Sequence, residues 1–337
     1  MINIALLGAG RIGQMHAKII TDTANCKLSY VFDVYKPSAE KVAAQFNASV
    51  AEDVDVILND EKVNAVLIAT TTDTHVDLII KAAKAGKAIL CEKPIDLSTE
   101  RVQQCWQEIQ SCNVPIQIGF NRRFDPTHAS LQQQLAEGAI GDLQQLIITS
   151  RDPDIAPTEY LRHSGGIFRD MIIHDFDMLR FITGEEATEI HAIGNTLIDP
   201  NLAEFNDVDS VMITIKTQSG RLCHINGSRR CVYGYDQRLE LLGSEGLLQA
   251  QNMLENTMVK STVAGVTGAK PTYFFLERYM PAYEAEWIAF VEAVETKSTF
   301  PVTLEDGVTA LAMAEAANRS LELGRAVLLE EVAPVLA

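Results

Sequence analysis

Short apolar runs alternate with amphipathic stretches over the first 120 residues of the chain. The apolar runs have the length of buried strands and lie at 2–7, 28–32, 65–69 and 88–91. Between them, apolar residues recur with a helical period at 12–21, 38–46, 54–59 and 76–85. Strands and helices that alternate with short connections are typical of a parallel, doubly wound α/β sheet. The pattern therefore predicts such a domain over residues 1–120.

A different pattern begins near residue 121, where strands follow one another with few intervening helices. Strands are predicted at 142–150, 188–198, 208–217, 221–228, 238–243 and 246–251. We therefore expect an α+β domain over residues 121–300 with a mainly antiparallel, open sheet. Helical periodicity returns at 277–294 and 304–324. We expect the C-terminal segment, 301–337, to pack back near the first domain.

A glycine-rich turn follows the first predicted strand and leads directly into the first predicted helix. Its sequence, GAGRIG, has the G-x-G-x-x-G pattern of dinucleotide-binding Rossmann domains. Gly8 allows the tight turn, Gly10 lets the backbone approach a pyrophosphate, and Gly13 lets the helix pack closely on the strand. Arg11 and Ile12 begin the helix, whose N–H groups and positive dipole end favour phosphates. The turn therefore predicts a dinucleotide site.

An acidic residue, Asp33, ends the second predicted strand, roughly 20 residues beyond the glycine turn. A carboxylate there can accept hydrogen bonds from both ribose hydroxyls of NAD and would repel the 2′-phosphate of NADP. The alternative is a turn aspartate that precedes Pro37. The glycines favour the cofactor role, and Lys36 leaves some use of NADP open.

Further polar residues follow the third and fourth predicted strands, whose carboxyl ends face the same ligand site. We expect Thr70, His75 and Glu92 to lie at the cofactor, with His75 capping or packing there rather than acting as a base. The ammonium group of Lys93, which precedes Pro94, can hydrogen-bond a substrate hydroxyl and stabilise a developing alkoxide. The alternative is a surface lysine in a turn.

Three polar residues interrupt an otherwise apolar stretch in the second domain. Asp170, His174 and Asp177 are spaced by four and three residues, which places their side chains on one face of a helix. A carboxylate one turn from an imidazole can orient the ring and raise its basicity, as a general base near neutral pH requires. The alternative is a capped helix whose histidine is a hydrogen-bonded core residue. The spacing alone does not choose between them.

The chain of 337 residues carries a formal net charge of −17. That sign disfavours nucleic acid and anionic membrane surfaces as partners. The sequence has no apolar run long enough for a transmembrane helix, and its histidines form no spaced cluster of metal ligands. The 6 cysteines include no C-x-x-C pair and are too few for a disulfide scaffold, so we expect reduced thiols in a cytoplasmic protein.

These motifs together resemble those of the glucose–fructose oxidoreductase/inositol dehydrogenase/MocA family. The resemblance rests on G-x-G-x-x-G, on Glu-Lys-Pro at 92–94 and on Asp-x-x-x-His-x-x-Asp at 170–177, and it covers nearly the whole chain. Three stretches are most similar to the bacterial inositol 2-dehydrogenase branch, at 119–125, 165–175 and 233–238. Many sugar dehydrogenases of the family have a glycine where this chain has Ile172, so the chain departs from the wider pattern there.

The resemblance implies a catalytic triad of Lys93, Asp170 and His174. In the family the lysine contacts the reacting oxygen, the histidine takes its proton, and the aspartate orients the histidine. The resemblance also implies that Arg122 contacts the substrate or the nicotinamide. The alternative for Arg122 is a surface arginine beside Arg123.

Other polar residues of the second domain are candidates for the substrate site. Asp152 begins a loop at 152–157 that either closes over the substrate or is a plain connection. Tyr233 and Tyr235 can donate hydroxyl hydrogen bonds to a polyol. The alternative for both tyrosines is a role in an interface or in the core.

The activity implied by the resemblance is NAD-dependent oxidation of a ring hydroxyl of inositol, from myo-inositol to 2-keto-myo-inositol (scyllo-inosose), in inositol catabolism. The alternatives are a dehydrogenase of another cyclic polyol or aldose, and an NAD-binding regulator without catalysis. A regulator would be expected to lack a member of the triad, and this chain has all three. The sheet of the second domain pairs with another subunit in the family, so we expect a homo-oligomer, either a dimer or a tetramer.

Overall fold

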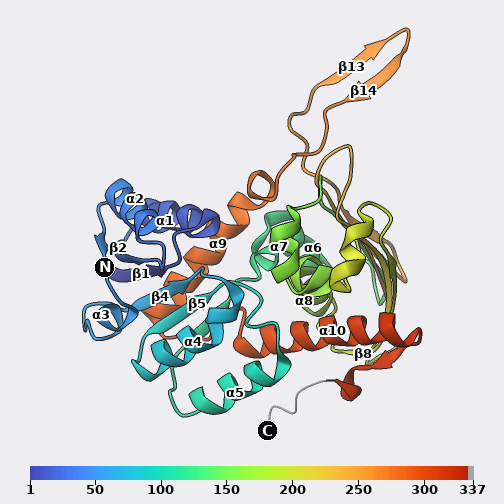
Figure 1. The fold of residues 1–337 in the computed structure, drawn as a ribbon. Coiled ribbons are helices and arrows are strands. Elements are labelled where there is room, and N and C mark those ends of the chain that lie inside the picture. Colours follow the sequence, from blue (N-terminus) through green and yellow to red (C-terminus); the bar gives the residue numbers. More distant parts are fainter. Residues whose placement is uncertain (333–337) are drawn as a thin grey trace. The chain divides into compact units, whose positions relative to one another are not determined.

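The structure of the protein is a computed structural model, and it describes residues 1–332. The chain forms two compact units, whose elements are labelled in Figure 1. Among the described residues, the first unit consists of 1–121 and 283–309, and the second of 122–282 and 310–332. Each unit is therefore built from segments that are far apart in the sequence.

The units divide the chain differently from the expected domains. The sequence interpretation assigned residues 121–300 to the second domain, whereas residues 283–300 belong to the first unit. Of the expected C-terminal segment, 301–309 lie in the first unit and 310–332 in the second. Residues 333–337 of that segment lie outside the described residues.

A sheet of six parallel strands forms the centre of the first unit, in the order β3-β2-β1-β4-β5-β6. The strands are β1 (Ile2–Leu7), β2 (Cys26–Phe32), β3 (Ser49–Val50), β4 (Ala65–Ile68), β5 (Ala88–Cys91) and β6 (Ile116–Ile118). The helices are α1 (Arg11–Asp22), α2 (Lys36–Phe46), α3 (Val54–Leu58), α4 (His75–Lys84) and α5 (Thr99–Ile109). The predicted doubly wound parallel sheet is confirmed, and the strand order reverses between β1 and β4, where such sheets bind ligands.

Residues returning from the far end of the chain complete the core of the first unit. They come from the later part of α9 (Phe275–Thr296) and the start of α10 (Leu304–Leu323). Trp287 is fully buried and its ring stacks on Phe290 at 5.3 Å, while Phe290 stacks on Phe300 at 5.2 Å. These aromatic rings explain why the segment packs with the first unit, since burying them removes a large apolar area from water.

A seven-stranded sheet forms the second unit, in the order β12-β11-β7-β10-β9-β8-β15. Its strands are β7 (Leu143–Arg151), β8 (Ala187–Asn195), β9 (Ser210–Thr217), β10 (Leu222–Ser228), β11 (Asp236–Gly243), β12 (Leu247–Ala250) and β15 (Val327–Leu328). Only the β7–β10 pairing is parallel among these strands, which confirms the predicted mainly antiparallel sheet. The helices of this unit include α6 (Pro126–Ala136), α7 (Thr158–His163) and α8 (Ile173–Thr183).

The two faces of this sheet differ in burial. In β9, Val211, Ile213 and Ile215 are buried in the core that includes α8, whereas the alternate residues Met212 and Thr214 are exposed. Successive side chains of a strand point to opposite faces, so one face of the sheet packs against helices. The opposite face, which we call the outer face, is open.

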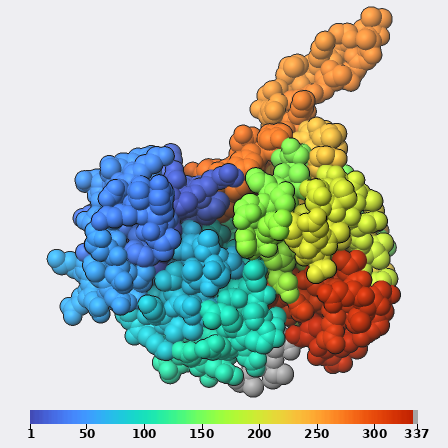
Figure 2. All heavy atoms as spheres, in the orientation of Figure 1, coloured from blue at the N-terminus to red at the C-terminus, as the bar shows by residue number. Residues whose placement is uncertain are grey.

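A two-stranded hairpin, β13 (Val259–Thr262) and β14 (Gly265–Gly268), extends from the second unit and was not expected from the sequence. All eight of its strand residues are exposed. Figures 1 and 2 show it in orange as an arm that stands clear of the rest of that unit. Its apolar residues therefore contribute nothing to the core of the unit.

Two further features are the apolar character of the helices and the state of the cysteines. Within residues 1–332, no helix has the length and apolar character needed to cross a bilayer. All 6 cysteines are free thiols, and burial raises the pKa of Cys105 and of Cys223 to about 12. The expected cytoplasmic location stays a prediction.

A buried histidine, His128, lies near the start of α6. The Asp125 carboxylate caps this helix by accepting hydrogen bonds from the N–H groups of Thr127 and His128, both at 3.1 Å. Asp125 also forms a buried ion pair with Arg278. Burial, with smaller effects from nearby arginines, lowers the pKa of His128 from its ordinary 6.5 to about 4. The imidazole is therefore neutral in the folded protein at pH 7.

This shift predicts a pH-dependent stability. The unfolded chain takes up a proton at His128 near pH 6.5, whereas the folded protein does so only near pH 4, so the free energy of unfolding falls as the pH drops across this window. We expect His128→Gln to reduce that fall by up to about 3 kcal/mol, measured by urea unfolding between pH 7 and pH 4. His163→Gln, at an exposed position, is the control. Equal pH dependence in both variants would contradict the assignment.

Candidate active site

The glycine turn lies between β1 and α1, and its three glycines differ in what surrounds them. Gly8 has a φ of +99°, and a Cβ added there would lie 2.3 Å from the carbonyl oxygen of Ala69. A Cβ added at Gly13 would lie 2.0 Å from the carbonyl oxygen of Gly8. A Cβ at Gly10 would meet nothing within 4 Å. Gly8 and Gly13 are thus required by the fold, while Gly10 leaves an open cradle.

Helix α1 begins at Arg11 and Ile12, directly after Gly10. In the described structure no side chain caps this helix, and its first turn holds no acidic residue. The Asp33 carboxylate, at the end of β2, accepts hydrogen bonds from the N–H of Ala9 at 2.7 Å and of Tyr35 at 2.8 Å. An uncapped helix end, an open backbone cradle and a nearby carboxylate fit the pyrophosphate and ribose of a dinucleotide.

The loops after β4 and β5 carry the remaining candidates of the first unit. His75 is buried, with Nδ1 at 2.8 Å from the carbonyl oxygen of Pro94 and Nε2 at 3.2 Å from that of Thr70. Burial lowers the pKa of His75. A neutral ring carries one N–H, so it donates to one of these two carbonyl oxygens and packs against the other. Glu92 contacts the buried His16, whose Nε2 lies 2.7 Å from Oε1. Lys93 follows at the end of β5 and is half-buried.

The predicted catalytic helix has an irregular start. Residues 168–172 form a π-helical turn that carries Asp170, and α8 begins at Ile173, directly before His174. The helix that the spacing predicted therefore begins as a π-turn, and Asp170 lies in this turn rather than in α8. Gly165 and Gly166 precede the turn, and both have a φ of +82°, which is the left-handed region that glycine favours. Single π-turns within helices are frequent at functional sites.

The three residues of the predicted polar face have different surroundings. Asp170 and His174 are half-buried, whereas Asp177 is fully buried. The Asp177 carboxylate pairs with Arg123, which donates from Nε at 2.8 Å and from Nη2 at 2.6 Å. Asp177 is thus part of a buried ion pair, and the candidate chemistry of this stretch narrows to Asp170 and His174.

Both oxygens of Asp170 accept hydrogen bonds from residues that the sequence interpretation did not identify. The hydroxyl of Tyr160, in α7, donates to Oδ1 at 2.7 Å. Nη1 of Arg229, which follows β10, donates to Oδ2 at 3.0 Å. Neither residue lies near Asp170 in the sequence, and no local spacing signals the contact. Only the folded unit brings these three side chains together.

Arg122 is buried, with 5% of its surface exposed, so the alternative of a surface arginine is wrong. Its Nη1 donates to Asp175 at 2.7 Å and its Nη2 to the Tyr235 hydroxyl at 3.4 Å. The guanidinium also lies 5.4 Å from the ring centre of Tyr279. Although burial lowers the pKa of Arg122, these neighbours raise it above its ordinary value, so the side chain remains a cation.

Asp152 lies close enough to interact electrostatically with the residues around Arg122 and with those that bind Asp170. Its charge raises the pKa of Arg122, of Tyr160 and of Arg229. Its own N–H donates to the carbonyl oxygen of Ser228 at 2.9 Å, which fixes the end of β7 against the end of β10. Within the second unit, the structure thus gathers Asp152 with the Asp170 and Arg122 groups.

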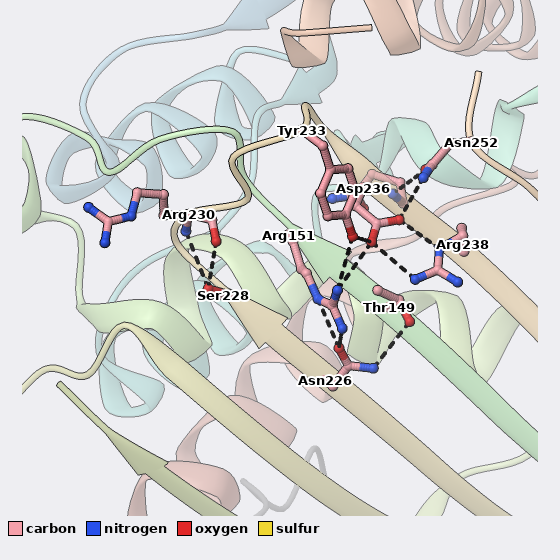
Figure 3. Close-up of polar contacts among 10 residues, drawn as sticks. Thr149, Arg151, Asn226, Ser228, Arg230, Tyr233, Asp236, Arg238 and Asn252 are labelled. Carbon is pink, nitrogen blue, oxygen red and sulfur yellow. Dashed lines mark hydrogen bonds and ion pairs between the residues drawn. The ribbon is translucent and has the colours of Figure 1, made fainter. Parts of the chain in front are cut away.

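Tyr233 belongs to a different network, shown in Figure 3. Its hydroxyl donates to Asp236 at 2.6 Å and accepts a hydrogen bond from Arg151 at 3.1 Å. Arg151 in turn donates to Asn226 at 2.8 Å. Gly227 faces Ile172 of the π-turn, so the preceding Asn226 points to the opposite, outer face of the sheet. The Tyr233 hydroxyl therefore lies with the outer-face network, away from the group around Asp170.

Comparisons with known proteins match nearly the whole length of the chain. A family model described as the oxidoreductase family with an NAD-binding Rossmann fold matches residues 2–120, and the GFO/IDH/MocA C-terminal domain matches residues 128–249. An inositol 2-dehydrogenase of Rhizobium meliloti is 43% identical over 95% of this chain and 97% of its own length. A myo-inositol 2-dehydrogenase of Thermotoga maritima is 41% identical over 98% of this chain and 99% of its own.

One of the similar solved structures contains a cofactor and a substrate. Scyllo-inositol dehydrogenase from Lactobacillus casei, crystallised with NAD(H) and scyllo-inositol, has a TM-score of 0.91 to this chain at 28% identity. The match covers 98% of this chain and 99% of that one. Among the described residues of this chain, no group of three or more histidine, cysteine, aspartate or glutamate side chains could hold a metal ion.

The contrast between the glycines predicts separable effects. Gly13→Ala places a Cβ 2.0 Å from a backbone oxygen, so we expect it to destabilise the protein by roughly 2 kcal/mol or more. Gly10→Ala meets no protein atom within 4 Å and should unfold like the wild type. Its added methyl group should instead obstruct the pyrophosphate and weaken NAD binding by about tenfold or more. Thermal unfolding and NAD titration would measure the two effects; unchanged NAD affinity in Gly10→Ala would contradict the cradle assignment.

Proposed function

Because the chain belongs to the GFO/IDH/MocA family of NAD-binding oxidoreductases, we propose that it oxidises a ring hydroxyl of an inositol with NAD. The observation that carries the proposal is its full-length similarity to inositol 2-dehydrogenases at 43% and 41% identity, with Lys93, Asp170 and His174 all present. The proposed reaction converts myo-inositol to 2-keto-myo-inositol.

In the proposed mechanism His174 is the general base. It takes the proton of the reacting hydroxyl, and the negative charge of Asp170 orients the imidazole and stabilises the imidazolium that forms. The Lys93 ammonium donates a hydrogen bond to the same oxygen and stabilises the developing alkoxide. A bound nicotinamide would accept the hydride from the carbon that bears this hydroxyl. The substrate thus loses one hydride and one proton, which leaves a ketone.

The cofactor site proposed for the first unit uses the glycine turn and the strand ends. Backbone N–H groups at Arg11 and Ile12 would bind the pyrophosphate, and the cradle at Gly10 leaves room for it. Asp33 would accept the ribose hydroxyls and disfavour a 2′-phosphate, which supports NAD over NADP. Thr70, His75 and Glu92 would line the site, with His75 as a neutral packing group.

The substrate site proposed for the second unit uses Asp152, Asp170, His174 and Arg122. Acidic and basic groups that are held in place can orient a polyol, since each hydroxyl both donates and accepts hydrogen bonds. Tyr235 is buried against Arg122 and would act through it. Tyr233 is not part of this proposed site, because its hydroxyl is engaged in the outer-face network.

A homo-oligomer through the sheet of the second unit is also proposed. The outer face exposes large apolar side chains from three adjacent strands, namely Ile193, Met212 and Leu222. Ile193 and Met212 are paired across β8 and β9, whereas Leu222 pairs with Lys216, farther along β9 on the same face. Pairing with a second copy of the chain would bury these exposed apolar side chains. The proposal covers a dimer or a tetramer.

The activity is tested by following NADH formation. Wild-type protein should reduce NAD with one or more inositols, and more slowly with NADP. We expect His174→Ala to lower kcat by about 10³-fold or more, since general base catalysis and the positioning of the substrate are both lost. His163→Ala, which removes an exposed histidine of the same unit, is the control and should retain wild-type rates.

Other outcomes point to the alternatives. Turnover of aldoses but of no inositol would reassign the substrate to another cyclic polyol or sugar. NAD binding without turnover of any polyol would contradict the enzyme and favour a regulator. Equal rates for His174→Ala and the wild type would contradict the general base.

The oligomer is tested by mass measurement in solution. We expect the double variant Met212→Asp/Leu222→Asp to lower the molar mass from light scattering, because it places charges on the apolar outer face. Val56→Asp changes an equally exposed apolar residue of α3 in the first unit and should leave the mass unchanged. A monomeric wild type, or an unaltered mass in the double variant, would contradict this interface.

A further inference from the structure

We infer that Arg229, held by Asp207, is a positioning residue that sets the carboxylate of Asp170 for the reaction. The inference rests on the proposed function, because the task of Asp170 is defined there. It concerns two residues to which neither the sequence motifs nor the family resemblance assigned a role. Both lie outside the stretch that carries Asp170 and His174.

Arg229 is rigidly held. It follows β10 and has only 2% of its surface exposed. One arm of its guanidinium, Nη1, donates to Asp170 Oδ2 at 3.0 Å, and the other, Nη2, donates to Asp207 Oδ2 at 3.2 Å. Its backbone N–H donates to the carbonyl oxygen of Asp209 at 2.8 Å. A planar guanidinium bound at both arms has little freedom to rotate, so it defines where the Asp170 oxygen lies.

Asp207 connects Arg229 to the backbone of the π-turn. Its second oxygen, Oδ1, accepts hydrogen bonds from the N–H groups of Ile167 and Val208, both at 2.8 Å. Ile167 directly precedes the π-turn and is its N-cap residue. A Cβ at Gly166 would lie 3.1 Å from Asp207 Oδ1, so the glycine permits this close approach. One carboxylate therefore fixes both the start of the turn and the arginine that binds Asp170.

The other oxygen of Asp170 has its own donor. Although 53% of the Tyr160 surface is exposed, desolvation of its hydroxyl and the charge of the hydrogen-bonded Asp170 raise the pKa of this phenol. The phenol therefore remains protonated and donates to Asp170 at 2.7 Å. The carboxylates of Asp170 and Asp207 raise the pKa of Arg229 despite its burial, so the guanidinium remains charged. Both oxygens of Asp170 are thus bound by donors whose protonation is fixed.

The charges of this group suggest why Asp207 is needed. One arginine shared between two carboxylates leaves a net charge of about −1 on the group. Asp170 therefore keeps part of its negative charge, which can stabilise a protonated His174 during the reaction. An arginine bound to Asp170 alone would neutralise it. Asp207 thus positions Arg229. It also shares the positive charge of Arg229, so that Arg229 neutralises Asp170 less completely.

The test compares Arg229→Gln and Arg229→Lys with Arg180→Gln. Arg180 lies on α8 and binds Glu186 through two hydrogen bonds at 2.7 and 2.8 Å, so it is a matched ion pair away from Asp170. The assay uses inositol deuterated at the reacting carbon. We expect Arg229→Gln to lower kcat by about 10–100-fold and to raise the deuterium isotope effect on kcat, because a misplaced catalytic group slows the chemical step.

Arg229→Lys should recover part of the rate, because lysine keeps the positive charge but lacks the two-armed guanidinium. Arg180→Gln should stay within about twofold of the wild type. A merely structural role predicts another result. Partial unfolding lowers the amount of active enzyme and leaves the isotope effect unchanged. A loss of rate in Arg229→Gln with an unchanged isotope effect, or no loss, would overturn the inference.

Two further variants keep the test decisive. If Arg229→Gln does not fold, Asp207→Asn replaces it, since the amide oxygen can still accept the hydrogen bond from the N–H of Ile167. The same rise in the isotope effect is expected for this variant. Its absence would overturn the inference. A wild type that is inactive on every inositol refutes the proposed function instead. In that case a double-mutant cycle of Arg229→Gln and Asp170→Asn in thermal unfolding tests the link, and additive effects would overturn it.

Discussion

The second unit depends on a single constraint, namely that charges removed from water must be paired. Four arginines of this unit are buried or nearly so, and each binds a buried or half-buried carboxylate: Arg122 with Asp175, Arg123 with Asp177, Arg229 with Asp170 and Asp207, and Arg278 with Asp125. Removing one member of such a pair leaves an uncompensated charge, which is far more costly than losing an apolar contact. Three of the pairs converge on the π-turn and α8, so ionic hydrogen bonds hold the segment carrying Asp170 and His174 in addition to its buried apolar side chains.

This arrangement separates two roles that neighbouring residues of similar chemistry perform. Asp175 and Asp177 are fully buried and satisfied by arginines, which makes them part of the scaffold. Asp170 and His174 lie half-buried on the same segment. The scaffold aspartates therefore fix the helix, while Asp170 and His174 keep part of their surface exposed. Precise positioning of this kind requires supporting contacts around the reactive groups as well as the groups themselves.

Much of the fold follows from local rules that operate within a few residues. The glycine turn is recognisable because Gly8 and Gly13 answer steric demands that arise between adjacent elements. The longer strands of both sheets are recognisable from their apolar pattern, since burial on one or both faces imposes it. The strands β3, β6 and β15 were not predicted, because they are too short to show such a pattern.

The surroundings of the site were less predictable, because they depend on pairings across long stretches of chain. The contact between Arg229 and Asp170 joins residues 59 positions apart, and that between Arg122 and Tyr235 joins residues 113 apart. The spacing of Asp170, His174 and Asp177 suggested a common role, and it could not reveal that Arg123 binds Asp177. The departure at Ile172 also has a distant explanation, because Gly227 on β10 leaves room for its side chain.

The return of residues 283–309 to the first unit has a consequence for protein synthesis. A nascent chain that has emerged only as far as residue 121 contains all six strands of the parallel sheet but lacks Trp287, Phe290 and Phe300. The dinucleotide-binding unit therefore cannot complete its core until nearly the whole protein has left the ribosome. In contrast to domains that fold one after another from the amino terminus, these two units complete their cores almost together.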